Sequence, residues 1–207
     1  MYEDEHFYAH KGVNFSAIVR AVWQTYIARE RKIGASTITM QLAKQLWDID
    51  SQSVLGKLVQ IRHALQLERH LSKQEILALY LNLVPYGYNI EGVGAAAWVY
   101  FDKPVAQLSE LEQLSLVVIP QNPSKRRLAD SKRQQQNQTA RQLLLTRLSK
   151  TDIAIAPSTQ RNIGLPIAAR APRQLPFKTP HVINHLNQQD GLANTLKTTI
   201  NPAIQTK

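Results

Sequence analysis

Apolar residues recur along this chain at the three- to four-residue spacing of an α-helix, and this pattern limits the fold more than any other feature. One stripe consists of Ile38, Leu42 and Leu46, and a second of Leu55, Leu58, Ile61 and Leu65. Residues at this spacing share one face of a helix, so each stripe predicts a helix packed against a core. We therefore predict a mainly α-helical domain over residues 1–150.

Two capping boxes, Ser72–Glu75 and Ser109–Glu112, predict where further helices begin. Glycines at 87, 92 and 94 predict a loop between a helix ending near Asn82 and an alanine-rich helix closing near Phe101. A polar, basic helix is expected from Asp130 to Leu148. Five prolines between Thr151 and His181 exclude long helices there, and the late segment "LKTTI" is a candidate strand without an obvious partner.

The 207 residues carry a net charge of +10 and include no cysteine. Disulfides and thiolate metal sites are therefore excluded, and no apolar run approaches the ~18 residues of a membrane-spanning helix. The charge predicts an anionic partner. The densest basic stretch, Lys125–Arg133, has no aromatic residue, which favours a solvated helix face or a membrane-surface patch over a nucleic-acid site.

The segment "GASTITMQLAKQL" (34–46) is a candidate anion site. Ser36 is a good N-cap, and the helix after it places Gln41 and Lys44 near one another. A helix N-terminus with hydroxyls and a lysine suits a phosphate, but a capped surface helix explains the same residues. Lys57, on the next predicted helix, is uninformative when taken alone.

The opening segment "YEDEHFYAHKG" places Glu3, His6 and His10 on one helical face. The two histidines have the spacing of a metal site, with Glu3 as a third ligand, but no further residue completes that site. Structural histidines and acid–base chemistry by Glu3 are the favoured interpretations.

Taken in order, these segments resemble the bacterial peptidoglycan glycosyltransferases, glycosyltransferase family 51. The family's first motif, E-D-x-x-F-x-x-H-x-G, is matched by Glu3, Asp4, Phe7, His10 and Gly12, and its second by Ser36, Thr37, Gln41 and Lys44. "LSKQEILALYLN" is similar to the fourth motif, and "GVGAAAWVYFDK" and "LSELEQLSLVVIPQNPS" follow in the family's order. Details such as "IPQNPSKRRL" look most like the C-type class A penicillin-binding proteins.

The resemblance implies a lysozyme-like fold and the polymerisation of lipid II with inversion, releasing undecaprenyl pyrophosphate at the periplasmic face of the inner membrane. Glu3 would be the catalytic base, and Ser36, Lys44 and Lys57 would stabilise the leaving group. The other substrate-binding residues that it implies are Asp4, His10, Thr37, Gln41 and Gln60. The implied partners are lipid II, the nascent glycan strand and the membrane surface, with no nucleic acid. No cofactor is required by this assignment, which leaves a divalent cation such as Mg²⁺ open.

The third motif of the family, R-K-x-x-E, is matched only at its lysine. Gly56 stands at the arginine, Lys57 at the lysine and Gln60 at the glutamate, and Gln52 replaces an arginine often found further upstream. An amide at position 60 can form hydrogen bonds but cannot titrate or hold a cation.

The resemblance also predicts the domain organisation. Residues 1–150 are expected to form the glycosyltransferase domain, and residues 151–207 a linker toward a transpeptidase domain, because "LKTTINPAIQ" resembles the start of that connection. Neither Ser-x-x-Lys nor Lys-Thr-Gly occurs, so penicillin-reactive chemistry is not expected here. Family members usually have a membrane helix and more of the fold before the first motif, so the chain is expected to be truncated at both ends.

Two other functions remain open. A lysozyme-like enzyme with a helix-borne glutamate could hydrolyse glycan rather than extend it. A non-catalytic fragment could act as a basic module that binds membranes or nucleic acid.

Overall fold

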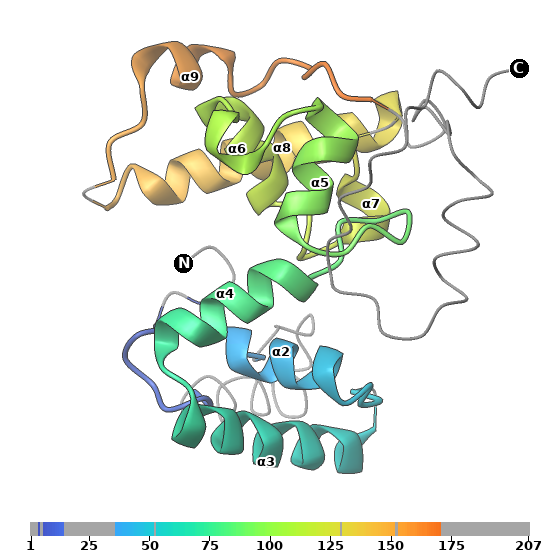
Figure 1. Ribbon diagram of the computed structural model, residues 1–207. Coiled ribbons are helices and arrows are strands. Elements are labelled where there is room, and N and C mark those ends of the chain that lie inside the picture. The colour runs from blue at the N-terminus through green and yellow to red at the C-terminus, as the bar shows by residue number, and fades with distance from the viewer. Residues whose placement is uncertain are drawn as a thin grey trace, which may run out of the picture. The chain divides into compact units, whose positions relative to one another are not determined.

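The computed structural model describes residues 4, 6–14, 36–51, 53–128, 130–151 and 153–170. In these residues the structure is mainly helical, with one isolated bridge between Pro85 and Glu91 and no strand, which confirms the predicted fold class (Figure 1). None of the helices in these ranges is both long and apolar enough to cross a membrane. The helices are α2 (Ile38–Leu46), α3 (Val54–His70), α4 (Lys73–Leu83), α5 (Val93–Phe101), the 3-10 helix η1 (Val105–Gln107), α6 (Glu110–Val117), α7 (Pro123–Arg126), α8 (Ser131–Leu148) and α9 (Pro157–Asn162).

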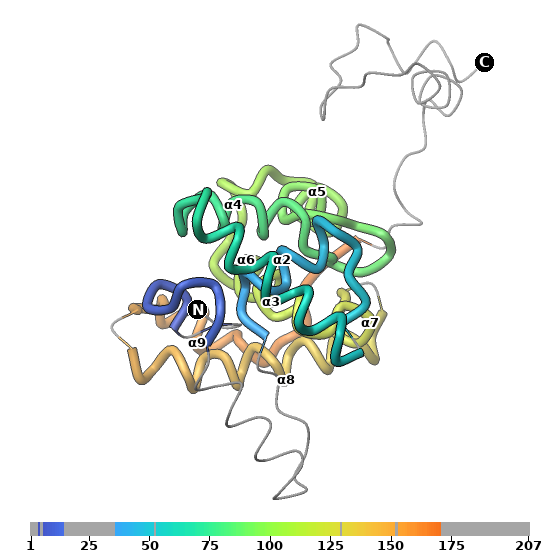
Figure 2. The backbone as a smooth tube through the Cα atoms, turned by 90° about the horizontal axis from the view of Figure 1, so that it is seen from below, coloured from blue at the N-terminus to red at the C-terminus, as the bar shows by residue number. Residues whose placement is uncertain are grey.

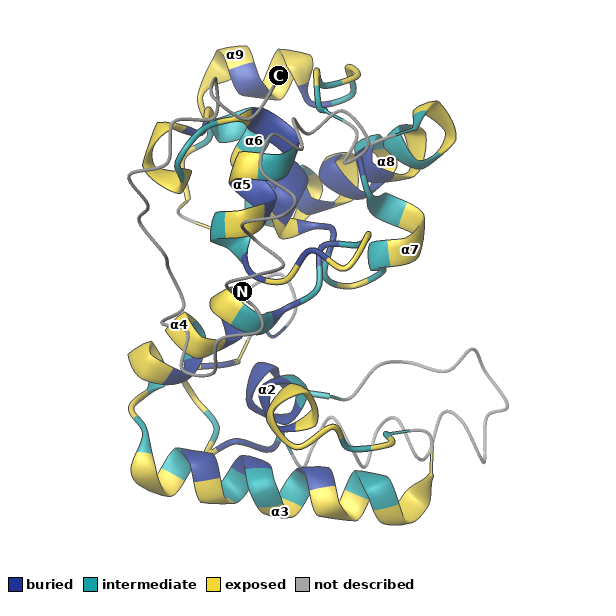
Figure 3. Cartoon of the chain, turned by 45° about the vertical axis from the view of Figure 1, so that its right-hand side comes forward, coloured by how far each residue is buried: buried dark blue, intermediate teal, exposed yellow. Residues whose placement is uncertain are grey.

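Helices α2, α3 and α4 pack against one another, and α2 is the most buried of the three (Figure 3). Ile38 and Leu42 lie in the core as the first stripe predicts, whereas Leu46 is 43% exposed near the helix end. The prediction for the second stripe is wrong at its start, because Leu55 and Leu58 are exposed.

The face of α3 that packs inward is a different one from the predicted stripe. It carries Gln60, Ala64 and Leu67, which recur at helical spacing and are buried. Ala64 has no long side chain, so the neighbouring backbone can approach α3 closely there, and Gln60 forms hydrogen bonds within the protein. Ile61 and Leu65, from the predicted stripe, are partly buried beside this face.

Helix α4 leads into the second group of helices, in which α5 contacts α4 and α6, and α8 contacts α6 and α7. Both predicted capping boxes are present, Ser72 with Glu75 at the start of α4 and Ser109 with Glu112 at the start of α6. The predicted end of α5 at Phe101 and both predicted ends of α8 are also confirmed, with Asp130 as the N-cap of α8. The main core is built from residues of both groups, including Phe7, Ile38, Leu42, Ile76, Tyr80, Ala97, Tyr100, Leu116 and Ile119.

The segment 153–170 runs back along α8 (Figure 2). The Arg141 guanidinium donates to the Leu165 carbonyl at 2.6 Å, and the Gln134 amide donates to the Ile167 carbonyl at 2.8 Å. Ile163 is buried, and the Arg170 amide donates to the Tyr100 carbonyl. This part of the predicted linker therefore packs against the helices, and α9 is short, beginning at Pro157 and ending before Pro166. The predicted strand within "LKTTI" lies outside the described residues.

Candidate active site

Asp4 joins the first sequence motif to the start of α2. Its Oδ2 atom accepts a hydrogen bond from the His10 ring Nε2 at 2.8 Å and another from the Ile38 amide at 3.2 Å. Only 6% of the Asp4 side chain is exposed. A carboxylate at the first turn of a helix is favoured by the helix dipole, so Asp4 stabilises α2 and orients the histidine at the same time. The structural interpretation of His10 is supported by this contact.

Further contacts hold the residues that follow Asp4. The Thr37 hydroxyl donates to the Gly12 carbonyl at 2.6 Å, and the Phe7 ring is completely buried. Gly12 has φ +83°, and a side chain at this position would meet the Glu68 Cγ atom and the Ala64 carbonyl at under 3 Å. Only glycine suits this backbone, which explains the residue that closes the first motif.

The cap of α2 differs from the prediction. Thr37, not Ser36, is the N-cap, because its hydroxyl accepts from the Met40 amide at 3.1 Å. With the Ile38 amide bound to Asp4 as well, two of the N–H groups at this helix start already have partners. The expected anion site at the helix N-terminus is therefore partly filled by the protein itself, and Ser36 is released for another contact.

That contact is with Lys57, which lies at the centre of the candidate site. The Lys57 ammonium donates to the Ser36 hydroxyl at 2.8 Å and to Oε1 of Gln60 at 2.9 Å. The ion pairs of the described residues include neither Lys57 nor Lys44. Burial lowers the pKa of the Lys57 ammonium below its usual range, and the positive charge of Lys44 lowers it further. Two lysines on different helices thus share one region of positive potential.

Gln41 and Lys44 lie on α2, and neither is among its buried residues. Gln41 is partly buried, and its Oε1 accepts from the Tyr80 hydroxyl at 3.4 Å, while Lys44 is exposed. The structure therefore brings together the Ser36, Lys44, Lys57 and Gln60 that the sequence selected, and it places Asp4, His10 and Thr37 beside the start of the same helix.

Two of the sequence-selected positions lie outside the described residues. These are Glu3, the predicted base, and Gln52. Among the residues that the structure does describe, no three His, Asp or Glu side chains are close enough to hold a metal ion. A site built from His6 and His10 would need Glu3 as its third ligand, so both it and the Mg²⁺ expectation stay open predictions.

Sequence reasoning missed a second carboxylate that is largely shielded from solvent, Glu68, whose side chain is 9% exposed. Its Oε1 accepts from the Thr39 hydroxyl and from the Lys73 ammonium, both at 2.7 Å. Lys73 also lies over the Phe7 ring, 4.5 Å from its centroid. This contact set ties α2, α3 and α4 to the first motif. The available signal was the spacing of 57, 60, 64 and 68, which puts Glu68 on the inward face of α3.

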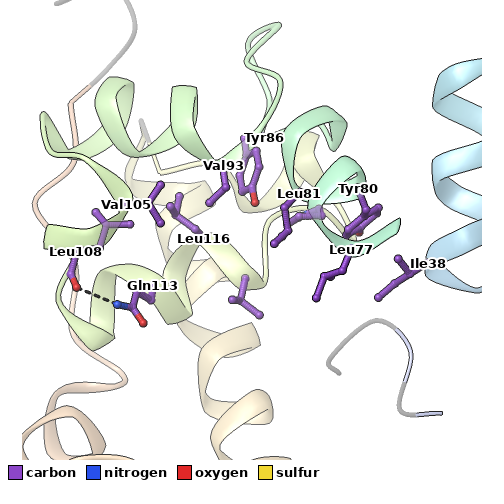
Figure 4. Close-up of a pocket in the computed structure, with 12 residues that line it drawn as sticks. Ile38, Leu77, Tyr80, Leu81, Tyr86, Val93, Val105, Leu108, Gln113 and Leu116 are labelled. Atoms are coloured by element: carbon purple, nitrogen blue, oxygen red, sulfur yellow. Dashed lines mark hydrogen bonds between the residues drawn. The ribbon is translucent and has the colours of Figure 1, made fainter. Parts of the chain in front are cut away.

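An apolar cavity of about 490 Å³ adjoins the site (Figure 4). Ile38 and Tyr80 line its end nearest α2, Val105 and Leu108 line the opposite end, and Leu116 of α6 lies between them. Gln113 also lines the cavity, and its side-chain amide is already bonded, donating to the Leu108 carbonyl at 3.0 Å. The cavity is thus an apolar space that starts directly behind the polar residues of α2.

The residues of this site lie on α2 and α3, beside the first motif. Residues 1–149 of this chain match the Transglycosylase family model. The chain belongs to the transglycosylase family. Membership supports the predicted lysozyme-like form of the helical fold.

Among its relatives, "Penicillin-binding protein 1C" of Escherichia coli K12 is 37% identical over 204 residues, which are 99% of this chain and 26% of that protein. "Penicillin-binding protein 4" of Bacillus subtilis 168 is 40% identical over 59% of this chain and 20% of its own length. A crystal structure of Penicillin-Binding Protein 1A from Haemophilus influenzae is 25% identical, with a TM-score of 0.42 over 76% of this chain and 20% of its own. The chain spans about a quarter of the length of Penicillin-binding protein 1C.

Proposed function

We propose that this chain is a peptidoglycan glycosyltransferase that polymerises lipid II into glycan strands with inversion and releases undecaprenyl pyrophosphate. The proposal is supported by its transglycosylase family match and by its similarity to penicillin-binding proteins. The reaction would take place at the periplasmic face of the bacterial inner membrane, with lipid II and the growing strand as partners. Residues 1–150 would be the catalytic domain, and residues 151–207 would lead toward a transpeptidase domain.

The pair Lys44 and Lys57 is the observation that carries this proposal. A departing pyrophosphate accumulates negative charge, and it is stabilised by fixed cations and donors aimed at that charge. Lys57 is held by two neutral oxygens and lies near the positive charge of Lys44, and no carboxylate of the described residues forms an ion pair with it. Binding an anion would relieve the repulsion between the two ammonium groups.

Glu3 is the proposed base. The attacking sugar hydroxyl is not acidic, so it requires a proton acceptor on its own side of the sugar ring. Glu3 directly precedes Asp4, whose carboxylate is fixed by His10 and the Ile38 amide. These contacts fix Asp4, the residue that follows the proposed base in the sequence, and a general base needs well-held neighbours.

The remaining site residues divide into two groups. Ser36, Gln41, Lys44 and Lys57 carry polar groups on the partly open side of α2 and α3, and we assign substrate contacts to them. Asp4, His10 and Thr37 already form bonds inside the protein, so we assign them the role of holding the first motif and α2 in place.

The decisive experiment incubates the protein with fluorescent lipid II and separates the products by length. We expect longer glycan strands from the wild type. The Glu3→Gln variant should lose about a hundredfold or more of this activity, because an amide cannot accept the hydroxyl proton. Glu5→Gln, two residues away, is the matched control and should retain it. Full polymerisation by Glu3→Gln would refute the assignment of the base.

The same assay separates the alternatives. Shorter fragments from a preformed glycan would identify a lysozyme-like hydrolase instead. A basic binding module would retain labelled DNA or anionic vesicles at physiological salt without extending glycan.

The predicted solvated basic stretch is less open than its sequence suggests, since Arg126 donates to the Val118 carbonyl, Arg127 lies over the Tyr88 ring, and Arg133 binds Asp130 and the Ser124 carbonyl.

A further inference from the structure

Gln60 lies where the family has a glutamate, and its contacts define a different role. We infer that Gln60 is a positioning residue whose amide fixes the Lys57 ammonium relative to α2 and does not touch the substrate. This inference rests on the proposed function for its catalytic meaning, although the geometry on which it depends is independent of it.

Both ends of the Gln60 amide are used inside the protein. Oε1 accepts from the Lys57 ammonium at 2.9 Å, and Nε2 donates to the Met40 carbonyl at 2.7 Å. The residue is only 1% exposed. A substrate outside the protein therefore cannot reach Gln60 without breaking one of these bonds. The amide connects a side chain of α3 to the backbone of α2.

The Met40 contact requires an amide. A carboxylate at position 60 could still accept from Lys57, but it has no hydrogen to donate to a carbonyl oxygen. Its second oxygen would face the Met40 oxygen in a buried place, and a buried acceptor without a donor is destabilising. A carboxylate would also cancel the Lys57 charge. The amide therefore orients Lys57 while leaving its positive charge available.

Lys57 depends on this support because its side chain is long. A lysine loses much rotamer freedom when its ammonium is fixed, and the Ser36 hydroxyl supplies only one further contact. Without the Gln60 amide, the Lys57 ammonium would keep the Ser36 contact but lose the bond that ties it to α2 through the Met40 carbonyl, so its position beside Lys44 would be less fixed.

A double-mutant cycle on inorganic pyrophosphate binding, measured by titration calorimetry, tests this coupling. Gln60→Leu should weaken binding about tenfold, and Lys57→Ala about tenfold or more, as expected for loss of a hydrogen bond to a charged group. The double variant should bind no more weakly than Lys57→Ala alone, because Gln60 acts only through Lys57. Gln66→Leu, on the exposed side of the same helix, is the matched control and should bind like the wild type.

Three results would overturn the inference: additive losses in the cycle, unchanged binding by Gln60→Leu, or no pyrophosphate binding by the wild type. The Gln60→Glu variant is a second test. It should bind pyrophosphate more weakly than the wild type, because it lacks the donor to the Met40 carbonyl. If Gln60→Leu does not fold, Gln60→Met keeps the side-chain length and enters the same cycle.

Lipid II polymerisation by the same variants separates this inference from the proposed function. Coupling in the cycle by a wild type that makes no glycan would refute the proposed function and leave the positioning role intact. Glycan polymerisation by the wild type, together with additive losses of pyrophosphate binding in the cycle, would support the proposed function and refute the positioning role. Equal losses in both assays for Lys44→Ala and Lys57→Ala, with smaller ones for Gln60→Ala, would agree with both.

Discussion

Replacing Asp4 by alanine should destabilise the protein and also impair catalysis, because one carboxylate supports two elements. The change removes the acceptor for the His10 ring and for the Ile38 amide. Both donors are buried or nearly so, with the His10 side chain 9% exposed and Ile38 2% exposed. Water can therefore reach neither of them easily.

The magnitude follows from these two donors. Each buried donor left without a partner costs about 1–3 kcal/mol, and losing a negative charge at a helix start adds about 0.3–1 kcal/mol. We expect the free energy of unfolding to fall by about 2–7 kcal/mol, which corresponds to roughly 5–28 °C in Tm for a domain of this size. Asp4→Asn keeps one carbonyl oxygen as an acceptor, so its loss should be smaller.

Denaturant unfolding followed by far-ultraviolet circular dichroism measures this loss. Glu91→Ala, which removes an exposed carboxylate, is the control and should change stability by less than about 0.5 kcal/mol. The polymerisation rate of Asp4→Ala should fall more than that of the control even under conditions where both are fully folded, because Glu3 loses its neighbouring anchor. A stability of Asp4→Ala within about 0.5 kcal/mol of the wild type would refute this reasoning.

Three further predictions concern charge, capping and the end of the helical unit. Because burial and the positive charge of Lys44 lower the Lys57 pKa in the folded protein, the unfolded chain holds more protons just below the usual lysine range. The free energy of unfolding should therefore rise with pH there, and denaturant titrations of Lys57→Met should show a smaller rise. Ser109→Ala removes the capping box of α6 and should cost about 1 kcal/mol in the same titrations, and no loss would contradict its role. A chain ending at Thr151 should be less stable by about 2–5 kcal/mol than one ending at Arg170. The shorter chain loses the buried Ile163 and the Leu165 carbonyl that accepts from Arg141. Equal thermal midpoints would show that the segment 153–170 does not stabilise the domain.

The helices that local signals define were predicted well from the sequence. Ser72 with Glu75 and Ser109 with Glu112 begin helices as expected, because a capping box satisfies its own N–H groups within four residues. Asp130 likewise caps α8 through the Arg133 amide. These contacts depend on the nearby chain alone, so the sequence contains all the information that they require.

The start of α2 was predicted at the wrong hydroxyl for a physical reason. Ser36 and Thr37 are both good N-caps, and only the fold decides between them. Thr37 takes the cap because its hydroxyl also reaches the Gly12 carbonyl, and Ser36 is bound by Lys57 from α3. Neither partner lies near the cap in sequence, so a local pattern cannot reveal the choice.

The inward face of α3 was missed because its key residue is polar. A periodicity argument assigns the apolar Leu55 and Leu58 to the core and turns Gln60 outward, yet Gln60 is buried and both leucines are exposed. Burial of an amide is stable only when both of its ends find partners, and here they come from Lys57 and the Met40 carbonyl.

The same amide explains how the chain can lack the glutamate of the family's third motif and still hold its lysine in place. A glutamate would bind Lys57 by charge, but it would also neutralise the ammonium and leave the Met40 carbonyl without the Gln60 donor. The glutamine accepts from Lys57 and donates to α2, so orientation comes from hydrogen bonds and the positive charge is kept. Burial and, after it, the positive charge of Lys44 lower the Lys57 pKa, so a bound anion would stabilise the charged form of Lys57. In the proposed reaction, that anion is the leaving pyrophosphate, and the two lysines would stabilise it most once its negative charge has formed.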